Sequence, residues 1–172
     1  QILQVDQHQD GITLLEEYID GANLAEIKLP EKQAVALMEE LCEVLVFLHS
    51  HGILHRDIKP SNLLLAADGH IRLIDFDAAR EEKPNGDSDT QLLGTKGYAP
   101  PEQYGFAQTD ARADIYAVGV TMKQLLGKWA EKRPYRHILR KCTEFAPKRR
   151  YQTAGALLRA LKTRAIQLWL PC

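Results

Sequence analysis

HRDIKPSN, residues 55–62, is a short polar stretch that lies between two apolar runs. It contains Asp57, Lys59 two residues later, and Asn62 five residues after Asp57. Within one loop this spacing brings together a proton acceptor, a cation and an amide that can bind a metal ion. Transfer of a phosphoryl group from a nucleotide needs such groups in one small volume. The stretch therefore predicts that chemistry if the surrounding sequence supports it.

Composition limits the class of protein. The chain has 172 residues, of which 45% are apolar, so it can bury the core of a single domain. Its net charge of -1 gives no electrostatic reason to expect nucleic acid or an anionic membrane as a partner. No apolar run approaches the ~20 residues that span a bilayer. Cys42, Cys142 and Cys172 lack C-x-x-C spacing, so we expect reduced thiols in a cytoplasmic protein.

Upstream of the polar stretch, the sequence predicts a strand and a long helix. Residues 11–19 form a β-rich run, which a turn at Asp20-Gly21 closes. Pro30 suits the first residue of a helix. Apolar residues then recur at steps of three and four over residues 31–50, which predicts an amphipathic helix that His51-Gly52 ends.

Downstream, the pattern predicts a hairpin, a loop and three helices. Residues 63–65 and 70–74 read as strands joined around Asp68-Gly69. Residues 81–90 are charged and rich in turn formers, so we expect a mobile loop there. The predicted helices are residues 114–126 (the central buried helix), 135–145 and 153–168. The expected fold class is mainly α with small β-hairpins.

Further polar motifs follow the first in a fixed order. They are Asp75-Phe76-Asp77, Gly94-Thr95, Pro100-Pro101-Glu102, Asp114 and Arg150. Together with residues 55–62 they resemble the C-terminal lobe of a eukaryotic-type (Hanks-type) serine/threonine protein kinase over nearly the whole chain, with a likeness to its bacterial members. The resemblance implies that residues 1–21 end the N-lobe strands and form the hinge. It also implies that residues 22–172 are the C-lobe, with the catalytic loop at 55–62 and the activation segment at 75–102.

The resemblance assigns roles at the reaction centre. Asp57 would accept the proton of a substrate hydroxyl, and Lys59 would neutralise the transferring phosphate. Asn62 and Asp75 would hold Mg²⁺ through oxygen ligands, with ATP as the phosphoryl donor. The plainer alternative for each of these acids is a solvated loop charge or a helix cap.

The same resemblance implies an adenine site. The backbone of residues 17–19 would read the adenine edge at Glu17 and Ile19, and Leu64 would form the floor under the base. The plainer alternative for residues 17–19 is an ordinary edge strand. Glu16 stands where the family usually has an apolar or small residue.

Structural and regulatory roles follow from the resemblance too. Asp114 would hold the backbone of the catalytic loop, and Glu102 would pair with Arg150. His55 and Phe76 would belong to an apolar stack between the lobes. Arg56 would bind a phosphate on the activation segment, with Ser88, Thr90 and Thr95 as candidate acceptors. Thr95 more readily serves as a structural contact to Asp57 and Lys59.

The chain also departs from the family pattern. Asp77 replaces a glycine that permits a positive φ. The segment between Leu126 and Tyr135 is short, whereas the family usually places a helix and a long docking loop there. The Gly-rich loop, the strand lysine and its glutamate partner do not occur in this sequence. We therefore expect a fragment of a longer kinase whose N-lobe lies elsewhere in the parent chain, with little or no activity by itself.

The motifs are compatible with three functions. The first is an enzyme that transfers phosphate from ATP to Ser or Thr of a protein substrate, which the full set Asp57, Lys59, Asn62 and Asp75 favours. The second is a pseudokinase-like, non-catalytic binding scaffold, which Asp77 and Glu16 favour. A third, a phosphotransferase for small molecules, uses a related loop, but residues 94–102 and Lys59 argue against it.

Overall fold

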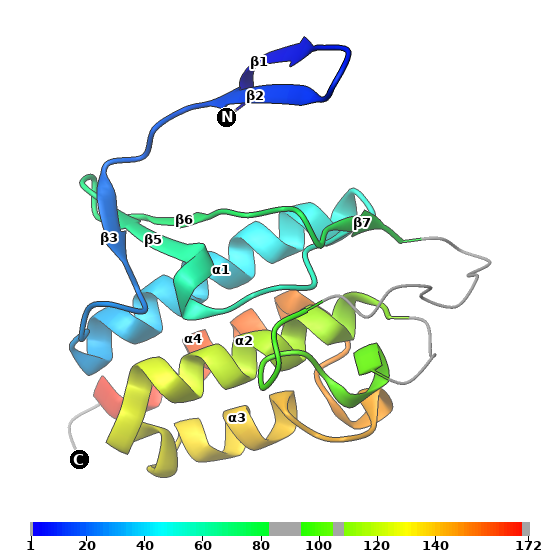
Figure 1. Ribbon diagram of the computed structural model, residues 1–172. Helices are drawn as coiled ribbons and strands as arrows, with labels where there is room; N and C mark the ends of the chain where they lie inside the picture. The colour runs from blue at the N-terminus through cyan, green and yellow to red at the C-terminus, as the bar shows by residue number, and fades with distance from the viewer. Residues whose placement is uncertain (1, 83–93, 105–108, 170–172) are drawn as a thin grey trace.

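The computed structural model describes residues 2–82, 94–104 and 109–169. In this part of the chain a body of packed helices carries short strands along one side (Figure 1). The helices are α1 (Glu31–Ser50), α2 (Ala111–Leu126), α3 (Tyr135–Cys142) and α4 (Ala154–Trp169), with the 3₁₀ turns η1 (Pro60–Asn62), η2 (Pro101–Tyr104), η3 (Gly127–Glu131) and η4 (Pro147–Arg149). The strands are β1 (Ile2–Gln7), β2 (Ile12–Glu16), β3 (Gly21–Asn23), β4 (Ile53–Leu54), β5 (Leu63–Ala66), β6 (Ile71–Leu73) and β7 (Arg80–Glu81). The expected fold of helices with small sheets is confirmed.

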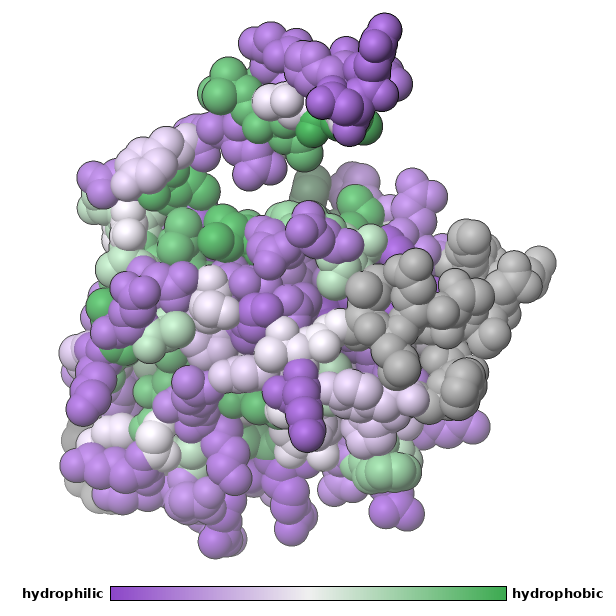
Figure 2. Space-filling model, viewed as in Figure 1, coloured by the Kyte–Doolittle hydropathy of each residue, from purple (hydrophilic) through white to green (hydrophobic). Residues whose placement is uncertain are grey.

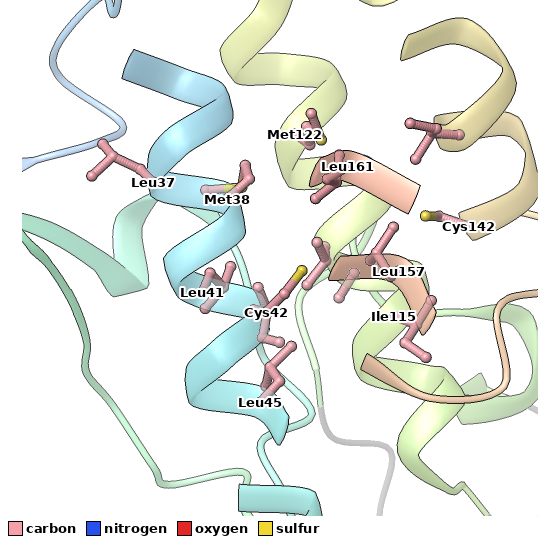
Figure 3. Close-up of a cluster of buried hydrophobic side chains, with 14 of the residues drawn as sticks. Leu37, Met38, Leu41, Cys42, Leu45, Ile115, Met122, Cys142, Leu157 and Leu161 are labelled. Atoms are coloured by element: carbon pink, nitrogen blue, oxygen red, sulfur yellow. The ribbon is translucent and has the colours of Figure 1, made fainter. Parts of the chain in front are cut away.

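The hydrophobic core lies where α1, α2, α3 and α4 meet (Figure 3). The apolar stripe predicted for residues 31–50 is the buried face of α1. Its members and their partners are Leu37, Met38, Leu41 and Leu45 of α1, Ile115 and Met122 of α2, and Leu157 and Leu161 of α4. Burial of such side chains supplies the main stabilising term of the fold.

Two cysteines lie in this core. Cys42 of α1 and Cys142 of α3 are free and fully buried. Burial raises the pKa of the Cys42 thiol to about 12 and also raises the pKa of Cys142. Because the thiolate is the reactive form, both cysteines act as small packing residues. Cys172 lies outside the described residues.

A three-stranded antiparallel sheet, in the order β3-β5-β6, lies against α1. The hairpin predicted around Asp68-Gly69 is present as β5 and β6. The turn predicted at Asp20-Gly21 is wrong, because Gly21 begins β3 and pairs with Ala66 of β5. A Cβ atom at Gly21 would lie 2.7 Å from the carbonyl oxygen of Leu65. Glycine is therefore required for close approach of two strands.

The hairpin of β1 and β2 stands apart from the helical body (Figures 1 and 2). The sequence predicts the second of these strands, which runs over residues 12–16 and not to residue 19. It does not predict β1, whose alternation of apolar and polar residues is short and includes a polar end. Large apolar side chains of the hairpin are more than half exposed, among them Leu3, Val5 and Ile12.

The helix boundaries differ from the predicted ones for local reasons. Helix α2 begins three residues before Asp114, because the side chain of Asp110 caps it by accepting a hydrogen bond from the backbone N–H of Arg112 (2.9 Å). Helix α3 ends at Cys142, and not at residue 145. None of the helices in the described ranges is both long and apolar enough to span a bilayer.

Candidate active site

The polar stretch forms a loop between two strands of different sheets. His55 directly follows strand β4, and the η1 turn after Lys59 leads into β5. Lys59 donates hydrogen bonds to Asp57 Oδ2 (2.7 Å) and to Thr95 Oγ1 (2.8 Å). Thr95 in turn donates to Asp57 Oδ1 from its hydroxyl (2.7 Å) and its backbone N–H (3.0 Å). The contact that the sequence predicts among these three residues is present.

The carboxylate of Asp57 is kept ionised by this network. Its burial alone would raise the pKa of Asp57, but the hydrogen bonds and charge of Lys59, with the hydrogen bonds of Thr95, outweigh burial and lower the pKa. Asn62 adds a further donor, because its Nδ2 lies 3.1 Å from Asp57 Oδ2 and 2.9 Å from the Asp57 carbonyl oxygen. The group at this position is therefore a fixed, negatively charged proton acceptor.

Asn62 and Asp75 are brought together by the backbone. The N–H of Ile74, the residue before Asp75, donates to the carbonyl oxygen of Asn62 at 3.0 Å. Both amide hydrogens of Asn62 point to Asp57, which leaves its Oδ1 oxygen for another partner. Asp75 is exposed and adopts a left-handed backbone with φ of 64°. The backbone bond therefore holds Asp75 one residue away from the contact with Asn62, which itself bonds to Asp57.

Asp77 fits this backbone without the strain that its replacement of glycine suggests. Among the described residues that are not glycine, only Arg56 and Asp75 have a positive φ. Asp77 uses an ordinary conformation, and its backbone N–H donates to Asp75 Oδ1 at 3.3 Å. Its exposed carboxylate adds negative charge next to Asp75. The substitution therefore changes the local charge and leaves this conformation of the chain unstrained.

Asp114 ties the loop to the helical core. Its side chain, which is fully buried in the first turn of α2, accepts hydrogen bonds from the backbone N–H of His55 (3.0 Å) and of Arg56 (2.7 Å). This is the contact that the sequence predicts for Asp114. The bond to Arg56 also helps hold a backbone with φ of 67°, an uncommon conformation for a residue with a Cβ atom.

Helix α1 contributes a residue that the sequence reasoning missed. Nε2 of His49 lies 2.8 Å from Asp114 Oδ2, so His49 and the loop share one carboxylate. Nδ1 of His49 is buried with no hydrogen-bond partner. An N–H at Nε2 can donate to the Asp114 carboxylate in this arrangement. No local signal marks His49, because its partner is 65 residues away.

The family of the chain follows from the order of these groups together with a comparison with known proteins. A sequence profile described as "Protein kinase domain" matches residues 1–157. The chain belongs to the protein kinase family. Protein kinases in general use ATP and Mg²⁺. The match begins at residue 1, so it includes the β1–β2 hairpin, and the expectation that the chain is only the C-terminal lobe stays a prediction.

Curated relatives of this kinase chain are serine/threonine kinases of bacteria and a protein kinase C of rabbit. Serine/threonine-protein kinase PknB of Mycobacterium tuberculosis is 36% identical over 118 residues, which are 64% of this chain and 19% of that protein. Protein kinase C zeta type of Oryctolagus cuniculus is 38% identical over 130 residues, 70% of this chain and 21% of that protein. A probable serine/threonine-protein kinase of Streptomyces coelicolor is 36% identical over 64% of this chain. The chain spans about a fifth of the length of these relatives.

The ion pair expected between Glu102 and Arg150 is present in this kinase chain. Arg150 has no exposed side-chain surface, and its Nη2 donates to Glu102 Oε2 at 2.8 Å while Nη1 donates to Oε1. Its other donors reach the carbonyl oxygens of Glu144 (2.8 Å), Phe145 (3.0 Å) and Arg112 (3.1 Å). All five N–H groups of the guanidinium are therefore used.

His55, the first residue of the loop, contacts residues of the segment that follows β6. The rings of His55 and Phe76 meet edge to face, with centroids 4.8 Å apart. Their place in an apolar stack between lobes stays a prediction. Desolvation by burial lowers the pKa of His55, so its ring stays neutral at pH 7. Its Nε2 lies 3.3 Å from the carbonyl oxygen of Ile74, which precedes the metal-site candidate Asp75.

Arg56, the expected phosphate-binding residue, is buried beneath the segment that carries Thr95. Its carbonyl oxygen accepts a hydrogen bond from Gln103 Nε2 at 3.0 Å. A Cβ atom at Gly94 would lie 2.3 Å from that same Nε2. Glycine at 94 therefore leaves room for the Gln103 side chain that bonds to Arg56. The candidate phosphorylation sites Ser88 and Thr90 lie outside the described residues.

The expected adenine site involves the segment before β3 and one residue of β5. Glu17 is exposed and Ile19 is half-buried, in an extended segment that is not part of a strand. Leu64 of β5 pairs with Asn23 of β3, the strand that this segment enters. The plainer alternative of an edge strand at residues 17–19 is wrong. The roles of Glu17, Ile19 and Leu64 in binding adenine stay predictions.

One prediction concerns His49. The His49→Ala variant should lose part of the support of Asp114, so the amides of His55 and Arg56 should exchange with solvent about fivefold to tenfold faster, equivalent to roughly 1 kcal/mol for one hydrogen bond. Amide exchange followed by NMR on the 172-residue chain measures this directly. His49→Gln, whose amide nitrogen can take the place of Nε2, should restore most of the protection. Unchanged exchange in the alanine variant would show that Asp114 needs no help.

Proposed function

We propose that this chain is the part of a serine/threonine protein kinase that receives the protein substrate and binds the metal. The reaction is transfer of the γ-phosphoryl group of ATP to the hydroxyl of a Ser or Thr side chain. The observation that carries the proposal is the Asp57 carboxylate, which Lys59, Thr95 and Asn62 hold in an ionised state. A solvated loop charge would not need three buried or half-buried donors.

In this proposal Asp57 accepts the proton of the substrate hydroxyl as that oxygen bonds to phosphorus and ADP leaves. A carboxylate has about four acceptor positions, and four hydrogen bonds already reach Asp57. The substrate hydroxyl therefore replaces a donor. The Thr95 hydroxyl can rotate away at little cost, and Lys59 then remains to face the transferring phosphate.

The residues present suit Mg²⁺. This ion is usually held by one or two protein oxygens together with substrate phosphates, and Asn62 Oδ1 and the Asp75 carboxylate supply that number. The described residues contain no cluster of three or more acidic, His or Cys side chains that would hold a metal by themselves. When bound, Mg²⁺ would neutralise charge on the phosphates. The conformations of Asn62 and Asp75 would set where it does so.

In this proposal the hinge lies at the end of residues 1–21 and separates two parts of the chain. Residues 1–21 are the end of the N-lobe, and the backbone at Glu17 and Ile19 reads the adenine edge above Leu64. Residues 22–172 are the C-lobe. The 172-residue chain alone is expected to show no turnover and weak nucleotide binding.

A second candidate function, a non-catalytic scaffold, is favoured by Asp77. Its carboxylate lies next to Asp75, and extra negative charge there either strengthens metal binding or repels the phosphates of a nucleotide. The enzyme and the scaffold differ in a measurable way, since only the enzyme loses a rate when Asp75 is removed.

The test is a radiolabelled-ATP assay on the full-length protein. Wild type should label a general protein substrate, and Asp75→Ala should reduce the rate by at least about a hundredfold, the scale for loss of a group that stabilises transition-state charge. Asp77→Gly is the matched control, because it changes the neighbouring acid and should keep or raise activity. A folded wild-type protein as silent as Asp75→Ala would leave the scaffold as the function.

A further inference from the structure

Helix α3 and the η3 turn before it carry a large excess of positive charge. Residues 127–142 contain six Lys and Arg residues against a single Glu, a net charge of +5, whereas the chain as a whole carries -1. The rest of the chain therefore carries -6. All six cationic side chains are exposed, and we name them the basic strip: Lys128, Lys132, Arg133, Arg136, Arg140 and Lys141. Hydrophilic side chains cover this end of the molecule in Figure 2.

Within the part of the chain that the structure describes, acidic groups do not pair with the basic strip. Over residues 2–82, 94–104 and 109–169, no ion pair joins one of its six members to an Asp or Glu. Glu131, the acid closest in sequence, pairs with Lys123 outside the strip (3.5 Å). Lys128 and Lys132 lie over the ring of Trp129 instead, at 5.5 and 4.3 Å from its centroid. The strip therefore presents its charge to solvent.

Part of this charge distribution works against the stability of α3, although Arg140 and Lys141 lie in its last turn, where the helix dipole favours a cation. Arg136 and Arg140 are four residues apart, a spacing at which like charges repel on a helix surface. Arg136 lies in the first turn, where the helix dipole disfavours a cation, and that turn contains no acid. Helices α1 and α2 follow the opposite rule, with Glu31 and Asp114 in their first turns. The folding of α3 explains Arg140 and Lys141 but not the other four cations, so a role outside the fold is the better account of the strip.

The core fixes the orientation of the strip. The apolar face of α3 is buried through Tyr135, Ile138 and Leu139. Because that face is committed to the core, α3 cannot insert into a bilayer as an amphipathic helix. Phe145, 78% exposed, lies four residues after Lys141 in the sequence, just beyond the C-terminal end of α3.

We propose that the basic strip binds an acidic segment of a partner protein, with Phe145 as an apolar contact for that segment. A short segment can touch the strip alone, and opposite charges there favour both binding and fast association. An extended polyanion such as duplex DNA or an anionic membrane would also meet the field of the remaining residues, which carry -6 and repel it. This inference stands independently of kinase activity.

Binding can be measured on the 172-residue chain with a fluorescein-labelled peptide of about ten residues, most of them Glu and Asp, by fluorescence anisotropy at low salt. The double variant Arg136→Glu, Arg140→Glu should weaken binding by at least about tenfold, because it reverses two charges at the centre of the strip. The matched control is Lys28→Glu, Arg159→Glu, which changes net charge equally at exposed positions outside the strip. The control should stay within about twofold of wild type. Circular dichroism checks that each variant is folded.

Other outcomes would overturn the proposal. Equal weakening by both double variants would mean that the peptide senses only the net charge of the chain. Binding of the strip variant within about twofold of wild type would exclude the strip as the site. Anionic vesicles or duplex DNA that bind wild type more tightly than the peptide, and lose binding in the strip variant, would assign the strip to a membrane or to nucleic acid.

Discussion

The Asp57→Asn variant of the full-length protein is expected to lose about 10²- to 10⁴-fold of its phosphoryl-transfer rate, the usual range for removal of a general base. An amide cannot take up the proton of the substrate hydroxyl. It also removes the charge that holds Lys59 at 2.7 Å and Thr95 at 2.7 Å, so these two side chains lose their common anchor. The loss should appear in kcat, because Asp57 acts on the reacting hydroxyl.

The matched control is Asp68→Asn, which makes the same chemical change at an exposed carboxylate whose partner is Arg72. Its rate should equal that of wild type. Initial rates with radiolabelled ATP at saturating protein substrate provide the measurement. An Asp57→Asn enzyme that keeps more than about a tenth of the wild-type kcat would remove Asp57 from the role of proton acceptor.

Arg150→Ala is expected to lower the free energy of unfolding of the chain by about 3–5 kcal/mol, the cost of leaving one partner of a buried ion pair alone. The Arg150 side chain has no exposed surface, and the variant would strand the Glu102 carboxylate together with three carbonyl oxygens. Arg150→Lys should recover only part of the loss, since one ammonium group cannot reproduce five donors in a plane.

Urea unfolding monitored by Trp fluorescence measures these changes. Arg72→Ala, which breaks an exposed ion pair with Asp68, should cost less than about 1 kcal/mol and serves as the control. The double variant Glu102→Ala, Arg150→Ala should cost less than the sum of the two single changes, because it leaves no unpaired charge. A loss below about 1 kcal/mol for Arg150→Ala would mean that solvent reaches Glu102 in the variant.

The sequence predicts elements well where the signal is local. The apolar stripe of residues 31–50 needs only helical periodicity, and α1 has those bounds. Strands β5 and β6 follow from Asp68-Gly69 in the same way. The sequence predicts a turn at Gly21 and not a strand, because glycine serves both turns and close strand approach. The carbonyl oxygen of Leu65 that decides between them lies more than forty residues along the chain.

In the candidate site too, contacts within known motifs are predicted and contacts between distant residues are not. Motif order brought Asp57, Lys59 and Thr95 together in the prediction, and the structure joins them by hydrogen bonds. The sequence does not predict the role of His49. A single histidine at the end of an amphipathic helix is usually an ordinary surface or core residue, and nothing near it in the sequence indicates a bond to Asp114. Asn62 was predicted as a metal ligand, and its second task, the two hydrogen bonds to Asp57, depends on the geometry of η1. The sequence therefore does not predict polar contacts between distant residues when neither a spacing nor a motif indicates them.

The β1–β2 hairpin has a consequence for how the chain unfolds. A two-stranded ribbon without a covered face is at best marginally stable in water. The hairpin joins the rest through the extended residues 17–20 and shares no extensive packing with the helices. Its amides should therefore open at a small fraction of the free energy that protects α1 and α2. The chain then behaves as two cooperative units, and a single melting temperature would describe the helical body but not the β1–β2 hairpin.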